Sequence, residues 1–129
     1  MKYLLDTHIL LWVAAKPENL SKQALTLIET DSNVLYFSSA SLWEIVIKQG
    51  LGRPDFHADA SVLYRGLIDN GYHELLVTSS HALAIANLPR HHKDPFDRIL
   101  IAQAITEGFT FITADKLITS YDGPILFVG

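Results

Sequence analysis

Apolar residues gather in short continuous runs along this chain. The runs cover residues 2–5, 34–37, 75–77, 109–113 and 125–128. Continuous runs of this length are typical of strands covered on both faces, whereas half-exposed strands alternate apolar and polar positions. Strands separated by helical stretches at this spacing predict βαβ units with right-handed crossovers. We therefore expect an α/β fold in which helices cover both faces of a parallel sheet.

The stretches between these runs have helical patterns, and several carry clear end signals. Residues 7–15 are apolar nearly all round, which predicts a buried helix. Asp94 before Pro95 is a strong start signal, because Asp caps a helix and Pro suits its first position. Asn70–Gly71 is a typical helix end. The other helices are expected at 21–30, 40–49, 58–69, from 79 to near 89, and 96–105.

Length and composition predict one domain that spans residues 1–129. A hydrophobic content of 49% is enough to fill the core of a chain of this size. No apolar run approaches the roughly 20 residues of a membrane span, and Asp6 and His8 interrupt any signal-peptide core. The absence of cysteine excludes disulfides and thiolate metal sites. We expect a cytoplasmic protein without a membrane segment.

Acidic residues follow the predicted strands at corresponding places. Asp6 ends the first run, and Asp115 follows the run 109–113. Glu44 lies just inside one predicted helix, and Asp97 lies in the first turn of another. Strand ends that lead into helices lie on one edge of a parallel sheet, so the four carboxylates are expected to share one patch.

Each acid also has a purely structural explanation. Asp6 could cap the first helix, and Ser41 to Glu44 matches a capping box. Asp97 could respond to the helix dipole, and Asp115 could make a turn. Capping does not explain why an acid recurs after the first, second and fourth predicted strands and again at the start of the helix 96–105, so the set as a whole favours a shared site.

The charge balance supports this interpretation. The net charge is −4, and without the four acids the chain has ten acidic and ten basic residues. Clustered carboxylates repel one another and favour a hard cation between them. An all-oxygen donor set suits Mg²⁺ or Mn²⁺ better than Zn²⁺, and the sequence leaves open whether one or two ions bind.

Several segments together resemble the PIN-domain ribonucleases, specifically the toxins of VapBC-type toxin–antitoxin pairs. They are Leu4–His8, Ser41–Ile45, Asp94–Ala104 and Thr113–Asp115, in the order and spacing of that family. The resemblance implies a three-layer α/β/α fold with a mostly parallel five-stranded sheet. It also implies Mg²⁺- or Mn²⁺-dependent cleavage of RNA, an antitoxin that blocks the site, and a homodimer. The family's catalytic and metal-binding acids map onto Asp6, Glu44, Asp97 and Asp115.

Other residues near these segments are candidates for auxiliary roles. Asp94 is interpreted as a helix cap, with a role in the site left open. A hydroxyl beside the acids could orient a carboxylate or the attacking water, although local capping explains each equally well. Arg98, Lys116 and the segment 90–93 could guide phosphates, or could be inert surface. The hydroxyl candidates are Thr7, Ser38, Ser39 and Thr113, with Thr113 the best placed.

Two other classes of function stay open. A phospho-acceptor domain also places acids at a sheet edge, but it needs an acidic pair after the first strand, where only Asp6 stands. A catalytically weak RNA- or partner-binding module would keep the fold without the chemistry. A zinc site at His91–His92 lacks further ligands at suitable spacing. His8 and His81 are expected to pack or cap locally, and Trp12 and Trp43 to be core or interface residues.

Overall fold

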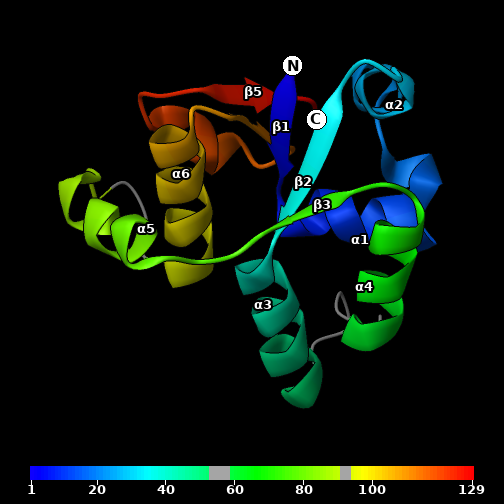
Figure 1. Ribbon diagram of the computed structural model, residues 1–129, viewed down its shortest axis with the longest axis horizontal. Helices are drawn as coiled ribbons and strands as arrows, with labels where there is room; N and C mark the ends of the chain where they lie inside the picture. The colour runs from blue at the N-terminus through cyan, green and yellow to red at the C-terminus, as the bar shows by residue number, and fades with distance from the viewer. Residues whose placement is uncertain (53–58, 91–93) are drawn as a thin grey trace.

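The computed structural model describes residues 1–52, 59–90 and 94–129. Five strands form one sheet in the order β3-β2-β1-β4-β5, and all four pairings are parallel (Figure 1). The strands are β1 (Lys2–Leu5), β2 (Val34–Ser38), β3 (His73–Leu75), β4 (Thr110–Thr113) and β5 (Ile125–Phe127). The expected α/β fold with a parallel five-stranded sheet is confirmed.

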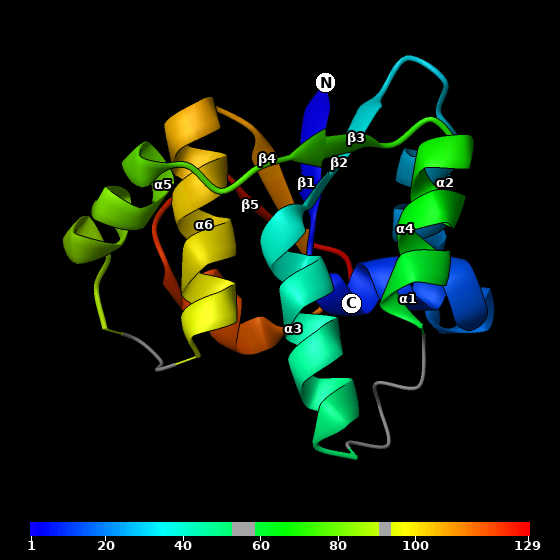
Figure 2. The ribbon, with the colours of Figure 1, turned by 60° about the horizontal axis from the view of Figure 1, so that its bottom comes forward.

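Helices cover both faces of this sheet. They are α1 (Thr7–Ala15), α2 (Lys22–Glu29), α3 (Ser39–Gly50), α4 (Ala60–Asp69), α5 (Ser79–Ala84) and α6 (Pro95–Glu107), with short 3-10 helices at Pro17–Asn19, Ile85–Asn87 and Lys116–Ser120. Helices α1, α2 and α4 lie on one side of the sheet, and α5 and α6 lie on the other (Figures 1 and 2). In the part of the chain that the structure describes, no helix is long and apolar enough to cross a membrane.

Successive residues of the central strands enter two separate cores. Leu5 and Ile112 pack with α1, α2, α3 and α4, whereas Leu4 and Phe111 pack with α6. All four are almost fully buried. A strand points alternate side chains to opposite faces, so a continuous apolar run supplies both layers at once. This explains why the strands read as unbroken apolar segments.

The strand order places a topological switch between β1 and β4. From β1 the chain moves outward through β2 to β3, then crosses to the other side of β1 for β4 and β5. In open parallel sheets, ligands bind in the crevice beyond the carboxyl ends of the strands where the order reverses. Asp6 directly follows β1 at this switch, and Thr113 ends the neighbouring strand β4.

The structure corrects two local predictions. The third strand was expected at 75–77 but lies at His73–Leu75, because its pairing with β2 sets its position, and Leu76 and Val77 are exposed beyond it. The cap of α3 is Ser38, whose hydroxyl accepts from the backbone N–H of Ala40, so the predicted capping box from Ser41 to Glu44 is wrong. The predicted loops at 53–55 and 91–93 lie outside the described residues.

Candidate functional site

Asp6 lies at the carboxyl end of the central strand and is almost fully buried, with 5% of its surface exposed. Its Oδ1 accepts a 2.7 Å hydrogen bond from the backbone N–H of Thr7, as the cap of α1. Its Oδ2 accepts a 2.7 Å bond from the hydroxyl of Thr113 at the end of β4. Elements far apart in sequence therefore fix this carboxylate.

Glu44 joins the same group through Thr7. The Thr7 hydroxyl lies 2.7 Å from Oε1 of Glu44 and 2.9 Å from the hydroxyl of Ser41. Because a carboxylate can only accept and a hydroxyl has one proton, Thr7 donates to Glu44 and accepts from Ser41. Thr7 thus contacts Asp6 with its backbone and Glu44 with its side chain, and all four residues are buried.

Asp115 is linked to Asp6 through Thr113. The backbone N–H of Asp115 donates to the Thr113 hydroxyl at 3.0 Å, and that hydroxyl donates on to Asp6. The Oδ1 of Asp115 accepts from the N–H of Leu117 at 2.9 Å and caps the following 3-10 helix. Asp115 therefore has a local structural role, as the cap of a 3-10 helix rather than as the expected turn residue, and it also stands near Asp6.

The buried position of Asp6 changes its protonation. Burial raises the pKa of Asp6 from 3.8 to about 7, and the negative charges of Glu44 and Asp115 add to the rise. The hydrogen bonds from Thr113 and Thr7 oppose it. A carboxyl group that takes up a proton near neutral pH in a crevice is a mark of a functional site.

Asp97 lies in the first turn of α6, which packs against α3 (Figure 2). The cap of α6 is Asp94, whose Oδ1 accepts from the backbone N–H groups of Phe96 at 2.9 Å and Asp97 at 3.4 Å. This confirms the interpretation of Asp94 as the cap. Both acids lie near the ammonium group of Lys48, which projects from α3.

Lys48 is a member of this group that the sequence analysis missed. Its Nζ donates to Oε2 of Glu44 at 2.6 Å and lies 3.8 Å from Oδ2 of Asp94. Burial lowers the pKa of Lys48, but the hydrogen bond and charge of Glu44, with Asp94 and Asp97, raise it above its ordinary value. The available signal was its position four residues after Glu44, which places both side chains on one helix face.

The structure also describes three further candidates, for which it shows no contact with the carboxylates of the four acids among the described residues. The guanidinium of Arg98 donates to the carbonyls of Pro89 at 2.8 Å and Ile85 at 3.3 Å. It therefore holds the segment before α6, and a phosphate-guiding role stays a prediction. The Ser39 hydroxyl accepts from the N–H of Val77, and Lys116 is exposed at the start of its 3-10 helix.

The histidines and tryptophans of the described residues behave as structural groups. His81 is buried, completes the capping box of α5 with Thr78, and lies 2.7 Å from a carboxylate oxygen of Glu107. This confirms its expected capping role. His8 packs edge-on to Trp12, which borders the core under α1.

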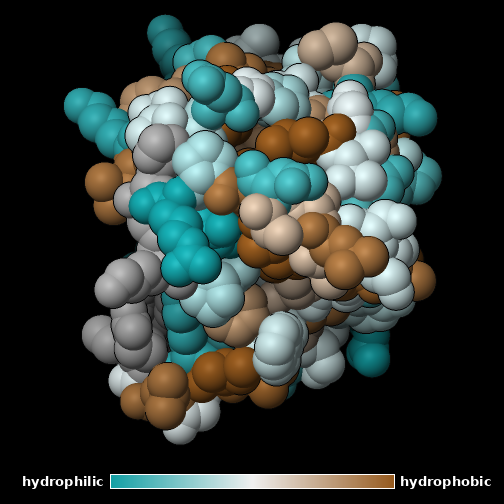
Figure 3. Space-filling model, turned by 90° about the vertical axis from the view of Figure 1, so that its left-hand side faces the viewer, coloured by the Kyte–Doolittle hydropathy of each residue, from teal (hydrophilic) through white to brown (hydrophobic). Residues whose placement is uncertain are grey.

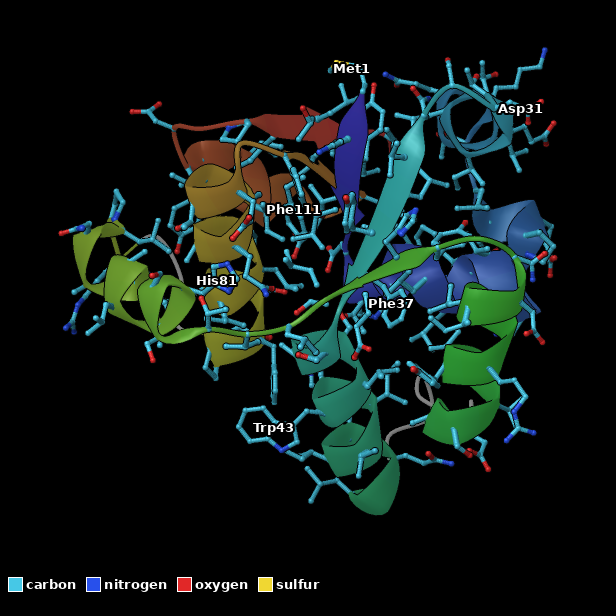
Figure 4. The ribbon with its side chains drawn as sticks, viewed as in Figure 1. Met1, Asp31, Phe37, Trp43, His81 and Phe111 are labelled. Atoms are coloured by element: carbon cyan, nitrogen blue, oxygen red, sulfur yellow. The ribbon has the colours of Figure 1, made fainter. Side chains whose placement is uncertain are left out.

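Trp43 borders an apolar groove beside the acids. It is 62% exposed, packs edge-on to Phe96 at 5.1 Å, and extends outward from α3 (Figure 4). The groove runs between α3 and α6. It is lined by Ser39, Ala40, Trp43, Val77, Ile85, Pro95, Phe96 and Ile99. On the face that carries α5 and α6, hydrophobic surface is interspersed with hydrophilic side chains (Figure 3).

A family model described as the PIN domain matches residues 3–124, nearly the whole chain. The chain belongs to the PIN-domain family. It is similar to Ribonuclease VapC22 of Mycobacterium tuberculosis (strain ATCC 25618 / H37Rv), with 27% identity over 121 residues, covering 94% of this chain and 92% of that protein. All four predicted acids lie within the matched range.

The fold of this PIN domain is shared with chains of two solved VapBC structures. One is VapBC2 from Rickettsia felis bound to a promoter DNA fragment, with a TM-score of 0.71 and 16% identity over 98% of this chain and 97% of that chain. The other is DNA-bound VapBC from Salmonella typhimurium, with a TM-score of 0.67 and 19% identity over 98% and 96% of the two chains. At these identities the likeness shows the fold.

The donor atoms of this PIN domain fit a hard divalent cation. Asp6, Glu44, Asp97 and Asp115 offer only carboxylate oxygens, and the pKa of Asp6 is raised by burial first and by the nearby charges of Glu44 and Asp115 in addition. Among the described residues, however, no three acidic or imidazole groups stand close enough to hold an ion as they are placed. Hydroxyls, amides and Lys48 satisfy the carboxylates instead.

Proposed function

We propose that this PIN-domain protein is a divalent-metal-dependent endoribonuclease that acts as the toxin of a toxin–antitoxin pair. The observation that carries this proposal is the buried Asp6 at the switch between β1 and β4, whose pKa is raised to about 7 by burial and, to a smaller extent, by the charges of Glu44 and Asp115. The match to the PIN domain and the similarity to a protein named as a ribonuclease support the reaction class. A cytoplasmic location belongs to the same proposal, because the proposed substrate is RNA.

Asp6, Glu44, Asp97 and Asp115 are the residues that would hold Mg²⁺ or Mn²⁺, as one or two ions. When bound, such a cation activates water for attack on phosphorus and offsets charge on the phosphate and on the departing oxygen. Thr7 and Thr113 orient Asp6 through hydrogen bonds of 2.7 Å, and Thr7 also orients Glu44. The positive end of the α6 dipole favours the ionised form of Asp97 in its first turn.

The chain's own groups also prepare the site for an anionic substrate. Net negative charge opposes loose binding of RNA, so recognition depends on the local cation rather than on a broad basic surface. Asp6 and Glu44 are buried, so they lie where the effective dielectric constant is lower than in water. Charge interactions between these groups and the scissile bond are therefore stronger than they would be at an open surface. Productive binding of RNA therefore requires that a bound cation first neutralises the negative charge of the acids.

RNA cleavage by purified protein tests this proposal. We expect Mg²⁺ or Mn²⁺ to support cleavage of structured RNA, EDTA to abolish it, and Asp6→Asn to remove most of it. Asp31→Asn is the matched control, because Asp31 is exposed just before the start of β2, whereas Trp43 lies on α3 beyond the other end of that strand (Figure 4). Full metal-dependent activity in a triple variant of Asp6→Asn, Glu44→Gln and Asp97→Asn would reject the assigned residues.

The partner protein follows from the same proposal. An antitoxin that blocks the acids would lie over the apolar groove between α3 and α6, where Trp43 and Phe96 are accessible beside the site. We place a homodimer contact on the remaining apolar surface without assigning its residues. Trp43→Ala should weaken the complex with the antitoxin encoded by the neighbouring gene, and should leave RNA cleavage intact. Unchanged affinity of this variant would remove the groove from the interface.

A further inference from the structure

Lys48 occupies a central place among the acids. Its Nζ is 2.6 Å from Oε2 of Glu44 and 3.8 Å from Oδ2 of Asp94. The side chain of Lys48 is 17% exposed and that of Glu44 only 3%, so the close pair is largely withdrawn from water. Asp97 adds its charge from the first turn of α6. A single ammonium group thus faces carboxylates from two helices.

Two helices fix the position of this ammonium group. Glu44 lies one turn before Lys48 on α3, whereas Asp94 and Phe96 belong to the start of α6. The ammonium lies 5.9 Å from the centre of the Phe96 ring, within the range of a cation–π contact. Because α3 and α6 pack together, the ammonium is held at the acids rather than at an open surface.

Both carboxylate oxygens of Glu44 already accept hydrogen bonds, so a divalent ion that binds Glu44 has to compete with Lys48 for it. Oε1 of Glu44 accepts from Thr7, and Oε2 accepts from Lys48. An ion that takes Glu44 as a ligand meets the ammonium group at the same carboxylate. We infer that Lys48 is a built-in counter-cation, which neutralises Glu44 in the metal-free protein and competes with the divalent metal ion for it. This inference rests on the proposed metal-dependent function.

Competition has two opposite consequences, whereas a merely structural ion pair would have only the first. Removal of the ammonium leaves Glu44 buried without its partner, which destabilises the metal-free fold. The same removal takes away a positive charge that repels the incoming ion, so it strengthens metal binding. A structural pair predicts only the first effect, because a damaged fold does not bind metal more tightly.

Titration of metal-stripped protein with Mn²⁺ by calorimetry separates these cases. Lys48→Met keeps roughly the length of the side chain but removes its charge, whereas Lys48→Arg keeps the charge. The matched control is Lys22→Met, at an exposed lysine in α2. We expect Lys48→Met to melt at a lower temperature without metal and to bind Mn²⁺ about tenfold more tightly, since close like charges impose at least such a penalty. Lys48→Arg and Lys22→Met should bind Mn²⁺ as the wild type does.

The outcomes distinguish this inference from the proposed function. If the wild type binds Mn²⁺ and Lys48→Met binds it equally or more weakly, the inference is overturned and the function stands. If neither binds Mn²⁺, the proposed metal-dependent function fails and the inference fails with it. Binding by Lys48→Met alone supports the inference. If Lys48→Met does not fold without metal, Lys48→Gln, which keeps a hydrogen-bond donor toward Glu44, gives the same comparison.

Discussion

The hydroxyl of Thr113 donates a 2.7 Å hydrogen bond to Oδ2 of Asp6, so the end of β4 orients the carboxylate at the end of β1. The same hydroxyl accepts from the backbone N–H of Asp115 at 3.0 Å. Thr113 is fully buried, and its side chain therefore has no alternative partner in water. One hydroxyl thus connects two of the predicted site acids across the topological switch of the sheet.

Loss of this hydroxyl should impair catalysis more than its size suggests. Thr113→Val keeps the shape of the side chain but leaves Oδ2 of Asp6 without a donor and the Asp115 N–H without an acceptor. Groups that orient metal ligands typically contribute about 10- to 100-fold in activity or metal affinity, and we expect a loss of RNA cleavage in that range. Thr113→Ser retains the hydroxyl and should retain most of the activity. A fully active Val variant would contradict the orienting role.

The pKa of Asp6 predicts a pH-dependent stability with a definite sign. The folded protein holds the proton of Asp6 up to a pKa of about 7, whereas the ordinary value is 3.8. The folded state thus binds this proton more tightly than the unfolded state, so the contribution of Asp6 to the free energy of unfolding is full below the ordinary pKa and is lost as pH rises toward 7. Thermal melts of metal-stripped protein at about pH 5 and about pH 8 measure this loss.

Asp6→Asn supplies the comparison for that experiment, because its amide does not titrate. Its melting temperature should fall less than that of the wild type between the two pH values, whatever the other carboxylates contribute to both proteins. Parallel falls in the two proteins would show that Asp6 does not carry the proton.

Metal binding should raise thermal stability and should weaken in acid. An ion that binds only the folded state stabilises it by about 2.7 kcal/mol at 100 times its dissociation constant. Mn²⁺ should therefore raise the melting temperature of the wild type, and clearly less that of Asp6→Asn. Because the ion requires ionised Asp6, its affinity should fall about tenfold for each pH unit below the pKa of that group. Calorimetry at two pH values checks this slope, and an affinity independent of pH would place the ion elsewhere.

Arg98 should matter for stability rather than for phosphate binding. Its guanidinium donates to the carbonyls of Ile85, Leu88 and Pro89 and to the hydroxyl of Tyr121. Arg98→Ala leaves these acceptors to find other partners, which costs about 1–3 kcal/mol for each group that stays buried and unsatisfied. We expect a lower melting temperature with an unchanged Michaelis constant for RNA. A stable variant with a raised Michaelis constant would favour the phosphate-guiding role.

The fold could be predicted from the sequence because its central strands are buried on both faces. Both cores contain residues of the central strands, namely Leu4, Leu5, Phe111 and Ile112. Their apolar runs can be recognised in the sequence without knowing which strands pair with one another. The edge strand β3 was misplaced because it pairs on one side only, so His73 and Glu74 carry no apolar signal. Strand order was not readable, since it depends on which faces of the helices meet the sheet.

The acids of the site could also be found in the sequence, but their contacts could not. Asp6, Glu44, Asp97 and Asp115 stand at strand exits and helix starts, which sequence patterns reveal. Their individual roles as metal ligands stay predictions. Lys48 was missed because a lysine four residues after a glutamate is common on helix surfaces, and only the packing of α3 against α6 encloses it with Asp94. Local sequence patterns locate the ends of strands and helices, whereas tertiary packing determines which side chains meet at those ends.

The location of Mn²⁺ in a crystal of this protein tests the central claim most directly. Anomalous scattering from crystals grown with Mn²⁺ should show a peak in contact with Asp6 and with at least one of Glu44, Asp97 and Asp115. Crystals of the same form grown with Mg²⁺ in place of Mn²⁺ are the control, in which this anomalous peak should be absent. An anomalous peak that contacts none of these carboxylates, in a protein that cleaves RNA with Mn²⁺, would contradict the account.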